Sequence, residues 1–249
     1  MKKLLTYVYA YYENKQMLQR QLQEWQSYPQ YVKDDLAIIV TDDCSSKQPI
    51  TELCQDFKAS DLDLKIFAIT KKVPWNWLAC RNIGAYHART KWLLLTDMDH
   101  MVEKHDIEHL FLYLKSSRAD DQLVYLFERV DAPNRSYYKP HDDSFLMTHK
   151  MYWRIGGYDE EFSGNYGTSG MYRKRAFDKA RGNLRLDIPL TRFPREVLAD
   201  ASTTEFVRKH PDNGPKLSAI RAVKAAEHRT DSIRTLSFPY EEIDFRKDK

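Results

Sequence analysis

The chain has 249 residues, of which 42% are hydrophobic, and this length suits one large domain or one domain with a C-terminal appendage. Its formal charge of +3 is too small to indicate a nucleic-acid-binding protein on that ground alone. The three cysteines, Cys44, Cys54 and Cys80, lack Cys-x-x-Cys spacing, which argues against a disulfide framework or a zinc site and favours the reducing cytoplasm. No stretch is long and apolar enough to predict a transmembrane segment.

The first hundred residues alternate between expected strands and expected helices. Leu18, Leu22 and Trp25 are spaced for one face of a helix that ends before Pro29. Further helices are expected at 50–57 and 77–89, and short apolar runs that fit buried strands lie at 4–10, 36–40, 62–69 and 92–96. The alternation predicts an α/β fold with a mainly parallel central sheet and helices on both faces.

Two carboxylates one residue apart, Asp97 and Asp99, follow the last of these strands. Alternate residues of a strand point to the same side, so both carboxylates can reach one cation, and Mg²⁺ and Mn²⁺ prefer oxygen ligands. Right-handed crossovers place the carboxyl ends of parallel strands along one edge, so Tyr12, Asp42 and Asp43 should gather in the same crevice. A solvated turn after the strand is the plain alternative for the two carboxylates.

The second half of the chain has a weaker pattern. A helix is expected at 107–114, strands at 123–127 and 144–148, a polar loop over the site at 131–143, and a strand within 193–201. Six of the eight glycines lie between Gly156 and Gly182, which indicates backbone that turns tightly or approaches a ligand, unless the segment is a plain surface loop. Helices are expected at 171–180 and 217–230, separated by a turn-rich break at 210–215.

Five short blocks, in order along the chain, resemble motifs of the family 2 glycosyltransferases, which have the GT-A fold. The blocks are Ala10-Tyr11-Tyr12-Glu13, Thr41-Asp42-Asp43-Cys44-Ser45, Arg81-Asn82-Ile83-Gly84-Ala85, Asp97-Met98-Asp99 and Gly156-Gly157-Tyr158-Asp159-Glu160. The resemblance covers residues 4–175 and implies a Rossmann-like nucleotide-diphospho-sugar transferase fold. On this basis we expect a catalytic domain at 1–200, with a donor-nucleotide half at 1–100 and an acceptor half at 101–200, followed by a C-terminal helical extension and tail at 201–249.

The resemblance also implies which residues bind the donor. Ala10 and Tyr12 would line the base pocket, with the Tyr12 ring stacked on a uracil-like base. Asp43 would accept a hydrogen bond from the base, Arg81 would lie beside the nucleotide, and Asp97 would approach the ribose. The expected donor is therefore a nucleotide-diphosphate sugar, such as a UDP-sugar.

A metal site is a further implication of the resemblance. Asp99, together with Asp97, would hold the Mn²⁺ or Mg²⁺ ion that bridges the diphosphate and neutralises its developing charge. Some related enzymes complete the metal shell with a distant histidine, and His210 is the candidate for that ligand. A structural role is the alternative for His210, as it is for His100 and His149, because imidazole suits softer metals than Mg²⁺.

The chain departs from the family at the position where many inverting members carry Glu-Asp, whose Asp removes a proton from the acceptor hydroxyl. It has Ser169-Gly170 there, and a serine hydroxyl is not a useful base without a partner. The candidate bases are the nearest carboxylates, Asp159, Glu160 and Glu161, with Asp142 and Asp143 behind them. For Asp159 the favoured alternative is a structural turn and helix cap.

Positive charge is concentrated just after the glycine-rich segment. Between Met171 and Arg195, eight Lys or Arg residues stand against two Asp residues. Arg173, Lys174 and Arg175 are therefore candidates for a cationic wall on the acceptor side, which would favour an anionic acceptor such as a glycan or glycolipid. A solvated helix face is the alternative. Aromatic residues are sparse here, so nucleic acid is a partner that the pattern does not favour.

The pattern supports several functions. The first hypothesis is a cytoplasmic, metal-dependent, hexosyltransferase-like enzyme that moves a sugar from the donor to a hydroxyl acceptor. The second is a transferase-like module that binds nucleotide or glycan but turns over weakly, because Ser169 replaces a carboxylate. A third, glycosylation of hydroxylated bases in nucleic acid, would require the base to be flipped out of a duplex. Nucleotidyl transfer is disfavoured, because no glycine follows the first strand at 11–14.

Overall fold

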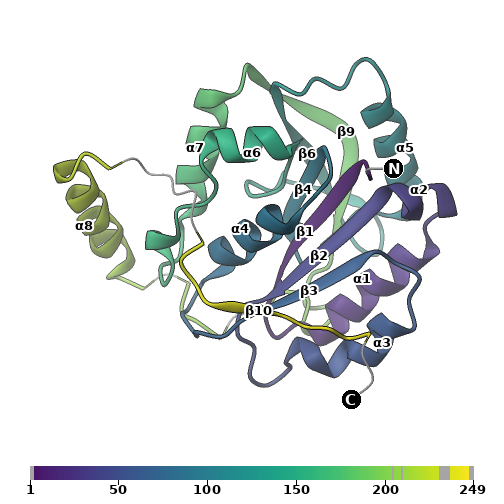
Figure 1. Cartoon of the computed structure of the whole chain (residues 1–249), viewed down its shortest axis with the longest axis horizontal. Coiled ribbons are helices and arrows are strands. Elements are labelled where there is room, and N and C mark those ends of the chain that lie inside the picture. The colour runs from purple at the N-terminus through teal and green to yellow at the C-terminus, as the bar shows by residue number, and fades with distance from the viewer. Residues whose placement is uncertain (1–2, 204, 209, 230–235, 247–249) are drawn as a thin grey trace.

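The computed structural model describes residues 3–203, 205–208, 210–229 and 236–246. Within these residues the strands form one sheet in the order β10-β3-β2-β1-β4-β8-β6-β9-β5, with β7 paired to β6 beside this path. Helices cover both faces of the sheet (Figure 1). The predicted α/β class is therefore confirmed.

The strands of the N-terminal half run parallel. They are β1 (Leu5–Tyr11), β2 (Leu36–Asp42), β3 (Leu64–Ile69) and β4 (Trp92–Asp97). In the pairing register Ala10 lies between Thr41 and Asp97, so the carboxyl ends of three neighbouring strands meet at one edge. All four strands lie where the apolar runs predicted them.

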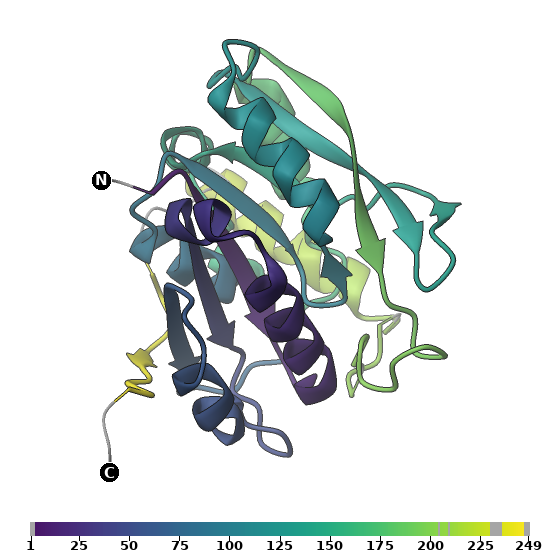
Figure 2. The ribbon, with the colours of Figure 1, turned by 90° about the vertical axis from the view of Figure 1, so that its right-hand side faces the viewer.

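Alternate residues of these strands feed two separate cores, because successive side chains point to opposite faces. Tyr7 and Tyr9 of β1 pack with α1 (Lys15–Ser27), α2 (Gln30–Asp35), α3 (Cys54–Lys58) and α5 (Lys104–Lys115). Val8 packs on the other face with α4 (Trp77–His87), α6 (His149–Ile155) and α7 (Ser169–Lys179). Figure 2 shows α1 and α5 on the near side of the sheet and the yellow-green α8 (Asn213–Ala226) behind it.

The second half of the sheet is mixed. Its strands are β5 (His100–Met101), β6 (Leu123–Asp131), β7 (Ser136–Tyr138), β8 (Phe145–Thr148) and β9 (Gly182–Arg192). β8 runs antiparallel between β4 and β6, whereas β9 runs parallel to β6. β7 lies inside the segment 131–143 that was expected to be a loop.

The expected strand within 193–201 is wrong, because β9 ends at Arg192 and the residues that follow form turns. Leu186, Ile188 and Leu190 alternate as a strand requires, but Pro189 argues against a paired strand. The structure accommodates this proline at an irregularity, where the β6–β9 register shifts between Phe127 and Glu128. Pro189 therefore kept the sequence pattern from predicting β9, although the β-bulge accommodates this proline.

The C-terminal segment joins the main body. Of the expected helical extension, α8 covers 213–226, and the short β10 (Tyr240–Glu242) pairs antiparallel with β3. Leu217 of α8 belongs to the core that contains α4 and α6. Residues 230–235 and 247–249, which include the end of the expected helix at 217–230 and of the tail, lie outside the described residues. Among the described residues, no helix combines the length and apolar character needed to cross a membrane.

Candidate active site

A pocket of about 510 Å³ opens at the carboxyl ends of β1, β2 and β4. The predicted residues Ala10, Tyr12, Asp43, Asp97 and Asp99 all line it. Other lining residues come from later segments: His100, Arg129, Lys139, His141, Asp143, Tyr166, Ser169, Arg192, Ser202, Phe206 and Arg208. Side chains distant in sequence therefore meet at the edge of the sheet where open α/β sheets bind ligands.

The turn that carries the two carboxylates is shaped by a buried amide. β4 ends at Asp97, Asp99 follows in a turn, and β5 begins at His100. The side chain of Gln21, fully buried on α1, donates to the carbonyl oxygens of Met98 at 2.9 Å and of His100 at 2.7 Å. Because both carbonyls are held, the turn presents its two carboxylates in a defined direction.

Asp97 lies between two nitrogen-bearing side chains. Its Oδ1 accepts from Arg81 Nη2 at 2.7 Å, and its Oδ2 lies 3.3 Å from His141 Nε2. Burial raises the pKa of Asp97, but its positively charged neighbours, His141 when protonated and the permanently charged Arg81, outweigh that effect and lower it. The carboxyl group is therefore ionised at neutral pH.

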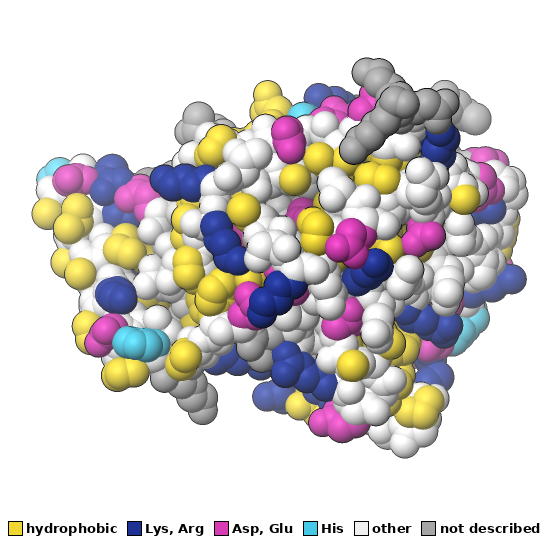
Figure 3. Space-filling view, turned by 90° about the horizontal axis from the view of Figure 1, so that it is seen from below, with side chains coloured by type: hydrophobic (Ala, Val, Ile, Leu, Met, Phe, Trp, Pro, Cys, Tyr) yellow, Lys and Arg dark blue, Asp and Glu magenta, His cyan; other side chains and the backbone are white. Residues whose placement is uncertain are grey.

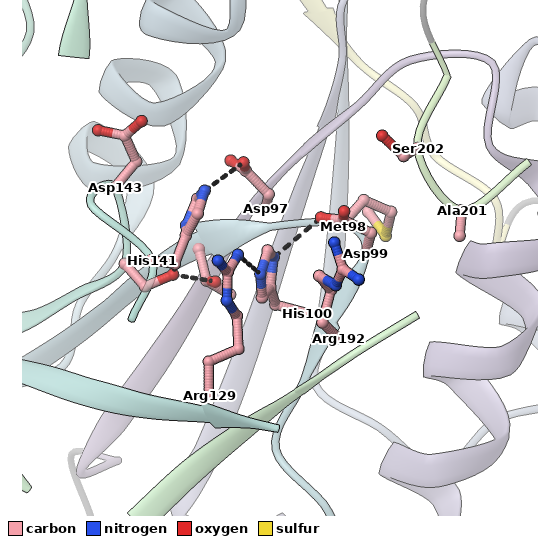
Figure 4. A network of polar contacts seen from close by, with 12 residues as sticks. Asp97, Met98, Asp99, His100, Arg129, His141, Asp143, Arg192, Ala201 and Ser202 are labelled. Atoms are coloured by element: carbon pink, nitrogen blue, oxygen red, sulfur yellow. Dashed lines mark hydrogen bonds and ion pairs between the residues drawn. The ribbon is translucent and has the colours of Figure 1, made fainter. Parts of the chain in front are cut away.

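Two histidines stack beside this carboxylate (Figure 4). The rings of His100 and His141 are 4.4 Å apart with an interplanar angle of 26°. Nδ1 of His100 lies 2.9 Å from Asp99 Oδ1, and its Nε2 lies 2.9 Å from Arg129 Nη1. Burial, with His100 as the next cause, lowers the pKa of His141 to about 4. His141 is therefore neutral at pH 7, which is the form of imidazole that binds a metal.

These residues fit a divalent cation. Ligand atoms of Asp97, His100 and His141 all lie within 4.8 Å of one another, and Asp99 lines the same pocket. A carboxylate combined with neutral imidazole suits a transition-metal ion such as Mn²⁺ better than Mg²⁺, which prefers oxygen and water. The predicted ligand His210 has a side chain that is 49% exposed and that faces Asp212. It does not line the pocket.

The predicted base pocket is lined by aromatic residues. The Tyr12 ring stacks on Phe206 with a centroid distance of 5.5 Å, and its hydroxyl donates to Glu205 at 2.6 Å. Asp43 accepts from the backbone nitrogen of Asn76 at 3.0 Å. Its Oδ1 is buried without a hydrogen-bond partner among the described residues, and burial raises the pKa of Asp43 well above its usual range. An unsatisfied buried acceptor indicates a site that a ligand donor completes.

The Arg-Asn-x-Gly block on α4 positions residues of the site without lining the pocket itself. Arg81 is fully buried, does not line the pocket, and donates to Tyr158 Oη at 2.7 Å in addition to its bond with Asp97. Asn82 donates to the carbonyl oxygen of Tyr158 at 2.8 Å. Gly84 lies against Val8 of β1, where an added Cβ would overlap the valine methyl group. The block therefore holds the helix close to the sheet and connects it to the Gly-Gly-Tyr-Asp-Glu segment.

The candidate bases of that segment lie outside the pocket. Asp159 forms an ion pair with Lys224 at 2.8 Å, and both side chains are only 2% exposed. Glu160 accepts from Asn82 at 2.7 Å and from the backbone nitrogen of Ser237. Glu161 pairs with Lys224 at 3.0 Å and with Arg229. These contacts connect the segment to α8 and to the chain that follows it.

The two remaining candidate bases are neighbours with different surroundings. The side chain of Asp142 is 73% exposed, forms an ion pair with Arg173, and does not line the pocket. Asp143 does line it, and burial raises the pKa of its carboxyl group to about 6. His141 and Asp143 lie on the segment that was expected to cover the site.

The predicted cationic wall on α7 also lies away from the pocket. Arg173 pairs with Asp142, Lys174 with Asp178 at 2.6 Å, and Arg175 donates to the carbonyl oxygen of Gly157 at 2.6 Å. The cations that line the pocket are Arg129, Lys139, Arg192 and Arg208. Seen from below (Figure 3), basic and acidic side chains interleave over the surface rather than form a broad patch of one sign.

The profile of glycosyl transferase family 2 matches residues 8–181, whereas no curated protein matches the sequence. The structure resembles TarS of S. aureus in complex with UDP-GlcNAc, with 14% identity and a TM-score of 0.64 over 89% of this chain and 66% of that chain. It also resembles GalNAc-T7 with UDP, GalNAc and Mn²⁺, with 12% identity and a TM-score of 0.60 over 88% of this chain and 48% of that chain.

A third similar structure is the mannosyltransferase PcManGT from Pyrobaculum calidifontis with GDP-Man and Mn²⁺, with 14% identity and a TM-score of 0.57 over 91% of this chain and 76% of that chain. The chain spans only 39% of a longer TarS chain. The TM-scores establish a shared fold, and the profile match covers more than half of the sequence. The chain therefore belongs to glycosyltransferase family 2, a family of transferase enzymes, as its five motifs predicted.

Proposed function

We propose that the protein transfers a sugar from a nucleotide-diphosphate donor, a UDP-sugar, to a hydroxyl acceptor with the help of Mn²⁺ or Mg²⁺. The observation that carries the proposal is the convergence of Asp97, Asp99 and the neutral imidazole of His141 in one pocket with an unsatisfied base-pocket carboxylate, Asp43. A structural neighbour with UDP-GlcNAc bound and two with Mn²⁺ bound support the same assignment.

The donor would bind with its base between β1 and β2. Uracil has one ring N–H, which can donate to the unpartnered Oδ1 of Asp43. Ala10 leaves room beside it, and Tyr12 offers an aromatic face once Phe206 moves aside. Guanine also carries a ring N–H, so a GDP-sugar is the donor that a binding experiment must distinguish.

The diphosphate would lie over the end of β4. Asp97, Asp99 and His141 would hold the cation, and Arg81 keeps Asp97 oriented through its 2.7 Å bond. A bound divalent cation supplies positive charge to the departing diphosphate. Because Gln21 fixes the turn, the two carboxylates need little rearrangement when the donor binds.

For the acceptor we propose an anionic glycan or glycolipid. Arg192 and Arg208 line both the main pocket and an adjoining pocket of about 390 Å³, which Arg195 also lines. These arginines line the pockets, whereas the cations of α7 lie away from the main pocket, so they are the ones that would attract a phosphate or carboxylate group. Nucleic acid with a hydroxylated base is the less favoured acceptor. We also propose a cytoplasmic location, from the cysteine usage of the sequence.

Calorimetry and donor hydrolysis test the proposal together. We expect UDP to bind in the presence of Mn²⁺ more tightly than GDP or CDP, and UDP-sugars to release free sugar slowly. His141→Ala should weaken Mn²⁺-dependent binding about tenfold or more, as loss of a metal ligand does, whereas His210→Ala should leave it unchanged. Absence of binding by every nucleoside diphosphate would reject the proposal.

A second candidate function is a binding module with weak turnover, which the replacement of a family carboxylate by Ser169 favours. Nucleotide binding without any metal-dependent sugar release would support it. Sugar release that Asp99→Asn abolishes would eliminate it.

A further inference from the structure

Asp143 is a pocket carboxylate that forms no salt bridge among the described residues. It lies two residues before β8 and lines the pocket, as does Ser169, whose side chain favours the charged form of the Asp143 carboxyl group and so lowers its pKa. Its Oδ1 is buried and has no hydrogen-bond partner among the described residues. A buried acceptor oxygen without a partner calls for an explanation, and in a residue that lines a pocket a ligand donor can supply one.

The backbone around Asp143 is fixed to the end of β4. Its carbonyl oxygen accepts from Arg81 Nη1 at 2.8 Å, and the same guanidinium binds Asp97 through Nη2. Next to it, Ser144 Oγ lies 2.6 Å from Thr96 Oγ1 and 3.0 Å from His141 Nδ1. One buried arginine and one buried serine therefore hold Asp143 at a set position relative to the donor side of the pocket.

Ser169, which lines the pocket together with Asp143, relates this position to the family motif. By the family resemblance Ser169-Gly170 stands where many members carry Glu-Asp, with Gly170 at the place of the proton-accepting aspartate, and Ser169 begins α7 and lines the same pocket. Asp143 lines the same pocket, so a carboxylate remains near this place although its chain position has changed. Asp159, Glu160 and Glu161 have other partners outside the pocket.

We propose that Asp143 is the general base of the transfer reaction, a role that rests on the proposed function. The acceptor hydroxyl gives its proton to the Asp143 carboxylate, and its oxygen forms a bond to the anomeric carbon of the sugar. The bond from that carbon to the diphosphate oxygen breaks, and its electron pair leaves with the nucleoside diphosphate. The protonated Asp143 then returns the proton to water. A single displacement of this kind inverts the anomeric configuration.

The test uses water and azide as acceptors, so that the natural acceptor need not be known. Wild-type protein with Mn²⁺ and UDP-glucose, UDP-galactose or UDP-GlcNAc should release UDP by donor hydrolysis. Asp143→Ala should reduce this rate about 100-fold or more, the contribution expected of a general base, while UDP affinity measured by calorimetry stays within about twofold. Asp142→Ala is the matched control and should hydrolyse the donor at the wild-type rate.

Sodium azide distinguishes a base from a structural residue. Azide is an anionic nucleophile that has no proton to lose, so it should restore UDP release by Asp143→Ala and yield a glycosyl azide of inverted configuration. It should not accelerate Asp142→Ala. A second variant, Ser169→Asp in the Asp143→Ala background, should recover part of the hydrolysis, because it places a carboxylate in the same pocket as the one that was removed.

The outcomes separate the two proposals. If wild-type protein hydrolyses the donor and Asp143→Ala does so equally well, the base assignment is overturned and the proposed function stands. A slow Asp143→Ala variant that azide does not rescue, or that has lost UDP affinity, also overturns the assignment. If wild-type protein neither binds UDP nor releases it from any of the three donors, both proposals fail.

Discussion

The two halves of the sheet contribute to one pocket by different means. On the β3-β2-β1-β4 side, Ala10, Asp43 and Asp97 occupy the pocket because parallel strands end in register. On the other side, His141 and Asp143 come from an irregular segment that side-chain contacts position. Strand geometry therefore determines the donor side, and long-range contacts determine the opposite side.

The largest expected effect is on the donor side. Asp99→Asn keeps the shape of the side chain and an acceptor for His100 but removes a charge next to the proposed diphosphate site. We expect UDP release from a UDP-sugar to fall about 100- to 1000-fold, as for other losses of electrostatic stabilisation. The exposed Asp212→Asn serves as the control. An active Asp99→Asn variant would show that the strand-end carboxylates do not carry the chemistry.

The second effect concerns the stability of the opposite half. Lys224→Ala leaves Asp159 charged and buried without its partner, which should lower the free energy of unfolding by about 3 kcal/mol. Urea denaturation measures this change, with the exposed Lys216→Ala as control. The hydrolysis rate per folded molecule should not change, because the ion pair lies outside the pocket. A lower hydrolysis rate per folded molecule would instead support Asp159 as a candidate base.

The third effect tests the close approach of α4 to β1. Gly84→Ala introduces a Cβ that overlaps Val8 Cγ1, and overpacking of this kind should cost about 2 kcal/mol. Gly214→Ala on α8 has nothing within 4 Å of the new Cβ and should be neutral or stabilising. In thermal melting, the double variant Gly84→Ala/Val8→Ala should lose less stability than the sum of the two single variants. Additive losses in the double variant would argue against this contact.

The smallest expected effect is a change in pH dependence. Burial raises the pKa of Asp43, so the folded protein binds this proton more tightly than the unfolded chain does, and stability falls as pH rises above the unfolded value. Asp43→Asn should therefore increase the free energy of unfolding by about 1 kcal/mol at pH 8, with a smaller gain at pH 5. UDP affinity should fall about tenfold in the same variant if Asp43 accepts from the base. A pH-independent change would exclude the titration of Asp43 as its cause.

The sequence predicted the N-terminal half better than the rest because its strands are continuous apolar runs. Trp92 to Leu95 is fully buried on both faces, which produces an unambiguous pattern and places Asp97 and Asp99 at a strand end. α2 and α6 were not expected, because each is shorter than two turns and lies directly beside a strand. Pro189 concealed β9 for the reason given above.

On the opposite side of the pocket, spatial proximity depends on pairing that no local pattern reveals. Asp143 approaches Asp97 because β8 runs antiparallel to β4, with Phe145 opposite Leu95. The Gly-Gly-Tyr-Asp-Glu motif indicated Asp159 as a candidate base. In the structure Asp159 instead caps the turn that follows it, which was the favoured alternative from the sequence. Motif position indicated a functional segment, and only the fold showed which carboxylate faces the pocket.

The ends of the sheet have a consequence for how the molecule behaves in concentrated solution. In the described part of the chain, the strands at the two ends of the sheet path are β10, with three residues, and β5, with two. At the β10 end, so short an edge strand offers few free backbone groups to a strand of another molecule, so neighbouring copies cannot easily extend the sheet by pairing there. Loss of residues 236–246 would uncover the longer, apolar β3 and give crowded molecules a template for aggregation.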